Sequence, residues 1–209
     1  GPIFYHVFSQ FNAIVVFAVL GCLAVSPLPV LQLWLGASSP MVAPMADLLP
    51  YVLIGTMINA ISAGPYLLQM AAGWVRLKLI MNFTQVVLFV LLVPVLLPKY
   101  GMIAGAYLWI AINLAYFVIE APLVHRRYLK GELLRWWFQD TILPGSLALS
   151  LFVLAKYTLP HFTSPLLETL KLAVLAILVA LLLLAVLPQA RQAAGQKLRA
   201  LKATLAGRR

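Results

Sequence analysis

The chain has 209 residues, of which 64% are hydrophobic and only 10% are charged, and its formal net charge at pH 7 is +10. A soluble domain carries about 25% charged residues, so this composition excludes a soluble globular protein and indicates a membrane protein. Its single cysteine, Cys22, has no second cysteine for an internal disulfide.

The hydrophobic residues come in runs of membrane-spanning length. A hydrocarbon core ~30 Å thick is crossed by about 20 apolar residues in a helix, and six runs qualify. We therefore expect an all-α, polytopic membrane helix bundle over residues 13–187, between a cytoplasmic-side lead-in of residues 1–12 and a basic tail of residues 188–209. The expected spans are residues 13–35, 48–70, 79–97, 102–123, 141–158 and 166–187.

Most of the expected connections are short and turn-like, which makes successive helices antiparallel neighbours. The exception is the link of residues 124–140, in which basic residues stand beside Trp136 and Trp137. Tryptophan is enriched at membrane–water interfaces. We expect this link to be an amphipathic segment that lies on the membrane surface and is anchored by the two tryptophans.

Lysine and arginine predict the orientation. If the spans alternate, one face collects twelve of the 15 basic residues and the other face only Lys99, Lys156 and Lys171. By the positive-inside rule, the N-terminal end and the tail both face the cytoplasm. The net charge then reflects orientation and anionic lipid, and we expect no nucleic-acid partner. The tail has Leu198, Leu201 and Leu205 at helical spacing. We expect it to lie along the inner leaflet, and fraying into solvent is the alternative.

Catalytic constellations are scarce. The chain has five acidic residues and three histidines, and His6, His125 and His161 are scattered over termini and loops without a partner at metal-ligand or triad spacing. We expect no catalytic site, no metal and no cofactor, and hence no enzyme. The basic stretch that follows His125 has arginines that suit phosphate, although a positive-inside loop explains it better.

Polar residues within three spans form stripes at helical spacing, and exposing them to lipid would cost free energy. Singly, each is explained by an interhelical hydrogen bond. Together they suggest a shared aqueous lining, and we predict that the stripes of the second and fourth spans face one concave surface. The cavity candidates are Asn59, Ser62, Tyr66 and Gln69 in the second span, Asn82 and Gln85 in the third, and Asn113 and Tyr116 in the fourth.

Two further features of the fourth span suggest specific roles. Glu120 is an acid within the span and a candidate for ion coupling, but its place near the cytoplasmic end favours snorkelling or pairing with Arg126 or Arg127. Gly101 and Gly105 have the spacing that permits close backbone approach of a neighbouring helix. We expect that role to be packing rather than dimerisation.

Three stretches, read in order, resemble a known family: WLG at residues 34–36, YLLQMAAGWVRLKLIMN at 66–82 and LPKYGMIAGAYLWIAIN at 97–113. They are similar to the C-terminal half of polysaccharide transporters, the O-antigen and lipid-linked oligosaccharide flippases of the multidrug/oligosaccharidyl-lipid/polysaccharide exporter superfamily. The resemblance covers residues 13–129, and the last two spans only by hydropathy. It implies two six-helix bundles around a central cavity, of which this chain is one lobe and its partner a missing N-terminal helix bundle of the same protein.

The resemblance also implies a function. Rocking of the two bundles would carry the polyprenyl-diphosphate-linked glycan of a lipopolysaccharide or other polysaccharide repeat unit across the bacterial inner membrane. Cationic contacts to the diphosphate would come either from the missing bundle or from Arg76 and Lys78 at the cytoplasmic mouth. Two alternatives remain open. A multidrug or cation antiporter of the same superfamily would use Glu120, and an integral-membrane glycosyl- or acyltransferase of envelope assembly would need acidic residues and histidines gathered at one interface.

Overall fold

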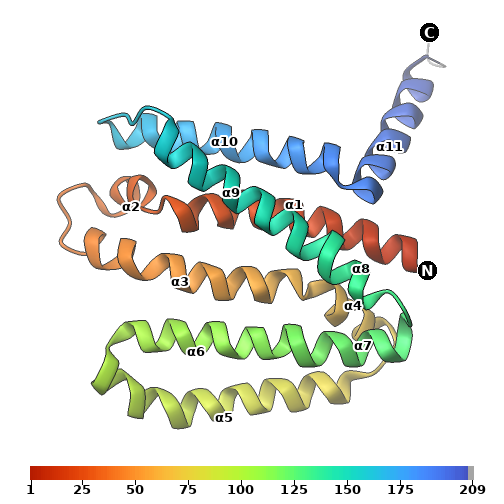
Figure 1. Ribbon diagram of the computed structural model, residues 1–209, viewed down its shortest axis with the longest axis horizontal. Coiled ribbons are helices and arrows are strands. Elements are labelled where there is room, and N and C mark those ends of the chain that lie inside the picture. The colour runs from red at the N-terminus through yellow and green to blue at the C-terminus, as the bar shows by residue number, and fades with distance from the viewer. Residues whose placement is uncertain (207–209) are drawn as a thin grey trace.

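The computed structural model describes residues 1–206, and within that range the chain is all-α with six helical segments long and apolar enough to cross a membrane. Successive segments run antiparallel to one another (Figure 1), which confirms the expected polytopic helix bundle. The membrane-length segments are Pro2–Val25, Val42–Ala71, Val75–Tyr100, Met102–Tyr128, Leu133–Thr158 and Pro165–Val186.

The first segment lies earlier in the chain than expected. Helix α1 covers Pro2–Val25, and a separate short helix, α2, covers Leu28–Leu35. Proline has no N–H and disfavours helical geometry in the residue before it, and Ser26, which precedes Pro27, is accordingly non-helical at φ −138° and ψ 68°. The proposed span of 13–35 is therefore wrong, and residues 1–12 are the first half of α1 rather than a lead-in.

The next three segments follow the expected spans with longer ends. The second consists of α3 (Val42–Ile61) and α4 (Ala63–Ala71), and the third is α5 (Val75–Tyr100). The fourth begins as α6 (Met102–Ala115), passes through the π-helical turn η1 (Tyr116–Glu120) and ends as α7 (Ala121–Tyr128). Gly73 and Gly101, at φ +68° and +71°, supply the left-handed conformations that turn the chain at the two ends of α5.

The expected surface link of residues 124–140 does not exist as one segment. After α7 the chain turns at Gly131, whose φ is +88°, and then runs through α8 (Leu133–Arg135) and the π-helical η2 (Trp136–Ile142) directly into α9 (Leu143–Thr158). Residues 133–142 thus extend the fifth membrane-length segment at its N-terminal end instead of lying on the membrane surface. Trp136 is fully buried, and its ring lies 5.3 Å from those of Phe117 and His125, so it packs in the core instead of anchoring an interface.

Helix α1 lies at the centre of the bundle, where it packs against α3, α9 and α10 (Pro165–Val186). Its residues Ala13, Ile14 and Phe17 belong to the largest buried apolar cluster. On the other side α3 packs on α6, and α6 packs on α5 (Figure 1). Helix α5 is the outermost: none of its residues, all of which the structure describes, is buried.

Close helix contact comes from a different glycine than expected. A Cβ built on Gly105 meets no atom within 4 Å, and the same holds for Gly101, so neither brings α6 close to a neighbour. The close approach is at Gly55 of α3, where a Cβ would stand 2.4 Å from Cδ1 of Trp109 on α6. Gly101 is needed for its turn conformation and not for packing.

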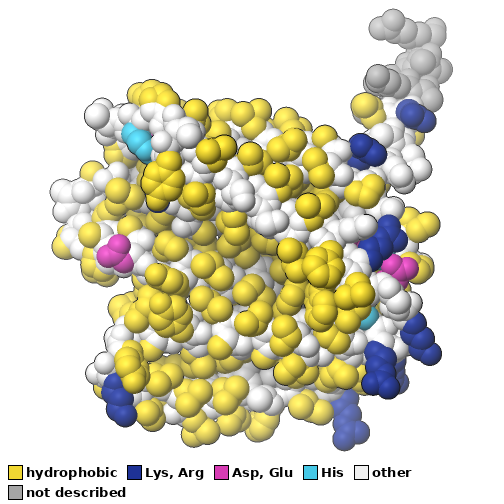
Figure 2. Space-filling view, in the orientation of Figure 1, with side chains coloured by type: hydrophobic (Ala, Val, Ile, Leu, Met, Phe, Trp, Pro, Cys, Tyr) yellow, Lys and Arg dark blue, Asp and Glu magenta, His cyan; other side chains and the backbone are white. Residues whose placement is uncertain are grey.

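The two ends of the bundle differ in charge. The start of α1, the turn between α7 and α8, and α11 (Pro188–Ala206) lie at one end, and α2 with the turn between α5 and α6 lies at the other (Figure 1). Lysine and arginine side chains gather at the first end (Figure 2). The division matches the alternation assumed for the twelve-to-three split, apart from the side chain of Lys202 and the residues Arg208 and Arg209, which the structure does not describe.

Candidate functional site

A cavity of about 300 Å³ lies between α3 and α4 on one side and α5 and η1 on the other. It gathers polar side chains from the second, third and fourth spans, so part of each expected stripe faces one concave surface. Asn59, Ser62 and Tyr66 of the second span and Tyr116 of the fourth line it, whereas Gln69 and Asn113 do not. We call it the polar cavity. Its lining residues are Asn59, Ala60, Ser62, Ala63, Tyr66, Lys78, Asn82, Gln85 and Tyr116.

One wall of the cavity is fixed by a pair of asparagines. Asn59 donates from Nδ2 to Oδ1 of Asn113 at 2.7 Å, and Asn113 donates to the carbonyl oxygen of Trp109 at 2.8 Å. Asn113 is fully buried behind the lining, so it does not reach the cavity itself. Its role is to hold Asn59, and through it α3, against α6.

The opposite wall is held by Tyr116 of η1. Its hydroxyl donates to Oε1 of Gln85 at 2.5 Å and lies 3.1 Å from the carbonyl oxygen of Met81. Both partners are on α5. This link between η1 and α5 places a phenol and an amide side by side in the lining, while Asn82 of α5 is exposed to the cavity with no partner recorded among the described residues.

An ion pair joins the lining residue Lys78 to Glu120, which lies behind the lining. Lys78 of α5 donates from Nζ to Oε2 of Glu120 at 3.2 Å, and Gln69 of α4 donates to Oε1 at 2.5 Å. The ammonium group also lies over the rings of Tyr116 and Tyr66, 4.5 Å and 5.4 Å from their centroids. These contacts stabilise the ammonium group.

This geometry corrects three expectations. The partner of Glu120 is Lys78 and not Arg126 or Arg127, because Glu120 ends η1 facing α4 and α5, whereas the two arginines lie beyond it on α7 and are exposed. Gln69 is fully buried under the ion pair and is not part of the lining. Arg76 is exposed and away from the lining, so only Lys78 of the two expected phosphate contacts reaches the cavity.

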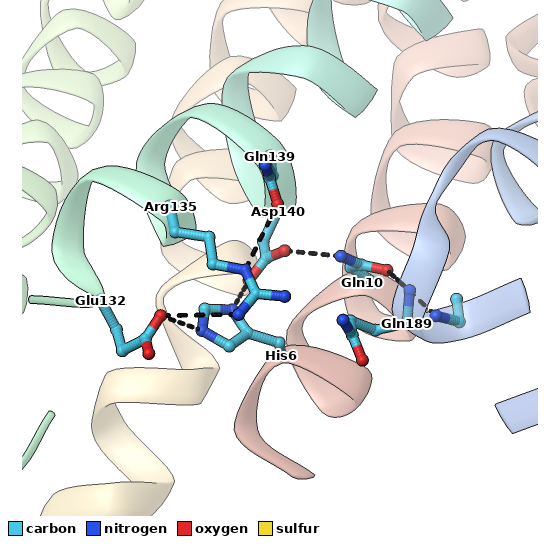
Figure 3. Close-up of polar contacts among 8 residues, drawn as sticks. His6, Gln10, Glu132, Arg135, Gln139, Asp140 and Gln189 are labelled. Carbon is cyan, nitrogen blue, oxygen red and sulfur yellow. Dashed lines mark hydrogen bonds and ion pairs between the residues drawn. The ribbon is translucent and has the colours of Figure 1, made fainter. Parts of the chain in front are cut away.

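Sequence reasoning missed a second polar site, at the end of the bundle where α1 begins (Figure 3). His6 hydrogen-bonds through Nδ1 to Oδ2 of Asp140 and through Nε2 to Oε2 of Glu132, the latter at 3.0 Å. Gln10 donates to Oδ1 of Asp140 at 2.8 Å. The sequence carries one signal of this site, the i, i+4 spacing of His6 and Gln10 in an apolar run, but the expected bundle begins only at residue 13 and leaves that run outside.

Over residues 1–206, which the structure describes, no group of three or more histidine, cysteine and acidic side chains is placed to hold a metal ion. Hydrogen-bonding and charged side chains gather in two places, the polar cavity and the second polar site, which we call the His6 cluster (His6, Gln10, Glu132 and Asp140). Comparison of the chain with protein-family models, with curated proteins and with solved structures finds no match.

Proposed function

We propose that the protein is a membrane transporter that moves a lipid-linked oligosaccharide, with the polar cavity as part of the path of the sugar headgroup. The observation that supports this most is the lining itself, in which amides and phenols from three membrane-length segments converge. Sugar hydroxyls both donate and accept hydrogen bonds, and amide side chains offer both kinds of group. An apolar substrate would gain nothing from such a lining.

Lys78 supports an anionic link between sugar and lipid. It is the one cationic side chain among the lining residues, and an ammonium group binds phosphate oxygens by charge-assisted hydrogen bonds. Its charge is balanced by Glu120, with 3.2 Å between Nζ and Oε2. A diphosphate that entered would compete with this carboxylate for the ammonium group.

The size of the cavity supports a second lobe. A volume of about 300 Å³ is at the low end for small-molecule sites, so a headgroup of several sugars needs a further wall. In this proposal a second helix bundle of the same protein provides it, and alternating access of the two bundles moves the headgroup. The charge asymmetry of the bundle ends supports placing the chain in a bacterial cytoplasmic membrane with its C-terminus in the cytoplasm.

A second candidate function is cation antiport, and Glu120 favours it. Its carboxylate is 4% exposed and lies beside the polar cavity, where protonation or cation binding would release Lys78. A transferase has less support: His6 and Asp140 are gathered as that reaction would require, but both side chains are fully buried and bonded to each other. No substrate reaches them in this arrangement.

The test is transport by the full-length protein in vesicles that contain a fluorescent polyprenyl-diphosphate oligosaccharide. A membrane-impermeant glycosidase reports the outer-leaflet pool, and we expect this pool to grow only in vesicles with the protein. Replacing the cavity residue Asn82 by leucine should slow the transfer, while Thr84→Leu, outside the lining on the same helix, should not. Proton-driven efflux of small organic cations that Glu120→Gln abolishes, without glycan transfer, would instead establish the antiporter.

A further inference from the structure

The His6 cluster joins four elements (Figure 3), and it lies at the end of the bundle where the basic side chains gather (Figure 2). His6 and Gln10 come from α1, Glu132 precedes α8, and Asp140 lies in η2. Gln10 extends the cluster to α11, since its Oε1 accepts hydrogen bonds from the backbone N–H groups of Gln189 and Ala190 at 2.9 Å and 3.0 Å. The cluster shares no residue with the lining of the polar cavity.

The two hydrogen bonds of His6 depend on how many protons the imidazole and its two carboxylate partners share. A neutral imidazole has one N–H donor and one nitrogen lone pair. Both ring nitrogens face carboxylate oxygens here, one of Asp140 and one of Glu132. A lone pair turned toward an ionised carboxylate is repulsive, so the two hydrogen bonds need two protons among the three groups. The arrangement therefore holds one proton more than a neutral histidine between two carboxylates.

The charges around His6 also favour binding of this extra proton. His6 and Asp140 have fully buried side chains, and a buried excess of negative charge is costly. The nearest other cation is Arg135, whose Nη1 lies 3.7 Å from Oε2 of Glu132. With the extra proton, two positive and two negative charges balance in the cluster. Without it, one negative charge is left over.

The remaining titratable or charged groups near the cluster do not replace that proton. Tyr5 packs edge-on against the His6 ring on one side and the His125 ring on the other, at centroid distances of 5.5 Å and 5.4 Å. His125 hydrogen-bonds through Nδ1 with the carbonyl oxygen of Ala121 in its own segment. On α11, Arg191 donates to the carbonyl oxygen of Ala185 and not to the cluster.

We propose that His6, Asp140 and Glu132 form a proton-binding site, separate from the polar cavity, and that the bound proton holds the start of α8 against α1. When the proton is lost, the hydrogen bond that breaks is the one between His6 and Glu132. Its side chain is 26% exposed, against 0% for Asp140, and it follows the turn residue Gly131. Asp140 stays in place because neutral His6 still donates to it and Gln10 donates to its other oxygen.

The proposal is tested with a spin label on the turn that Glu132 anchors. Lys130 is exposed and two residues from Glu132, so Lys130→Cys in a Cys22→Ala background of the full-length protein accepts the label. Its mobility is measured by electron paramagnetic resonance from about pH 5 to pH 9, the interval in which histidine sites exchange protons. We expect an immobile label at the acid end and a mobile label at the alkaline end.

Two isosteric variants sharpen the test. In Asp140→Asn or Glu132→Gln, an amide N–H can donate to the imidazole lone pair, so a neutral His6 satisfies both partners without the extra proton. Either variant should keep the label immobile at every pH. His6→Gln should leave it mobile at every pH. The control His161→Gln, which changes an exposed histidine at the other end of the bundle, should keep the pH response of the parent.

The outcomes decide the proposal either way. A label whose mobility does not change with pH in the parent protein shows that no proton holds the start of α8. A pH response that survives in both Asp140→Asn and Glu132→Gln assigns the titration to another group, His125 first. As an independent readout, ¹⁵N spectra of histidine-labelled protein should show the His6 ring losing its second proton over the interval in which the label is released.

Discussion

Lys78 and Glu120 form an ion pair whose two members are unequally buried: the lysine side chain is 17% exposed and the glutamate 4%. Removing one partner of a buried pair leaves an uncompensated charge. Lys78→Met should lower the free energy of unfolding by about 3 kcal/mol, because the carboxylate is left buried. Glu120→Gln should cost less, since the ammonium group still reaches the cavity and the tyrosine rings.

This asymmetry is measured by unfolding of the purified protein in detergent, with the double variant completing the cycle. Lys78→Met combined with Glu120→Gln should recover much of the stability lost in Lys78→Met alone. If the two single variants were equally destabilising and their effects additive, the pair would not be coupled in the way the geometry indicates.

Helix α3 meets α6 at a glycine that leaves no room for a methyl group. In Gly55→Ala the new Cβ would stand 2.4 Å from the Trp109 ring, which also donates from Nε1 to Thr56. Overpacking of this kind costs about 1–3 kcal/mol, and thermal unfolding should show the loss. Gly105→Ala is the matched control on α6, where the same methyl group meets nothing within 4 Å and should be neutral or stabilising.

Water in the polar cavity can be detected by thiol chemistry. Asn82 lines the cavity and its neighbour Phe83, which is 71% exposed, does not. In a Cys22→Ala background, Asn82→Cys should react with a membrane-impermeant maleimide because a thiolate forms only where water is present. Phe83→Cys should react far more slowly if it faces lipid. Equal rates at the two positions would contradict a watered cavity.

Trp136 should behave as a core residue. Its side chain is fully buried between Phe117 and His125, so Trp136→Ala should cost about 3–5 kcal/mol of stability. Trp34, which is 75% exposed at the end of α2, provides the comparison, and Trp34→Ala should have a much smaller effect. A small loss for Trp136→Ala in thermal unfolding would return it to the role of an interfacial anchor.

Hydropathy and polar periodicity predicted the features that depend only on whether a side chain can face lipid. Asn59 and Tyr116 were assigned to a common surface because a polar group in a membrane span must turn away from lipid, whatever its partner. The partners themselves depend on how distant helices meet. Glu120 bonds Lys78, 42 residues away, and not the nearby arginines, and His6 bonds Asp140 across 134 residues. A single proline, Pro27, was enough to shift the first span.

The contacts of Gln10 have a consequence for biosynthesis. Its acceptor oxygen is paired only with backbone groups 179 and 180 positions later in the chain. At a synthesis rate of about 5–20 residues per second, α1 is made roughly 10–35 seconds before α11. During that interval the acceptor oxygen of Gln10 lacks its final partners, whereas the imidazole of His6 lacks its own only until Glu132 and Asp140 have been made, 126 and 134 residues after it. Until α11 is made, that oxygen must therefore be hydrogen-bonded by water or by transient neighbours.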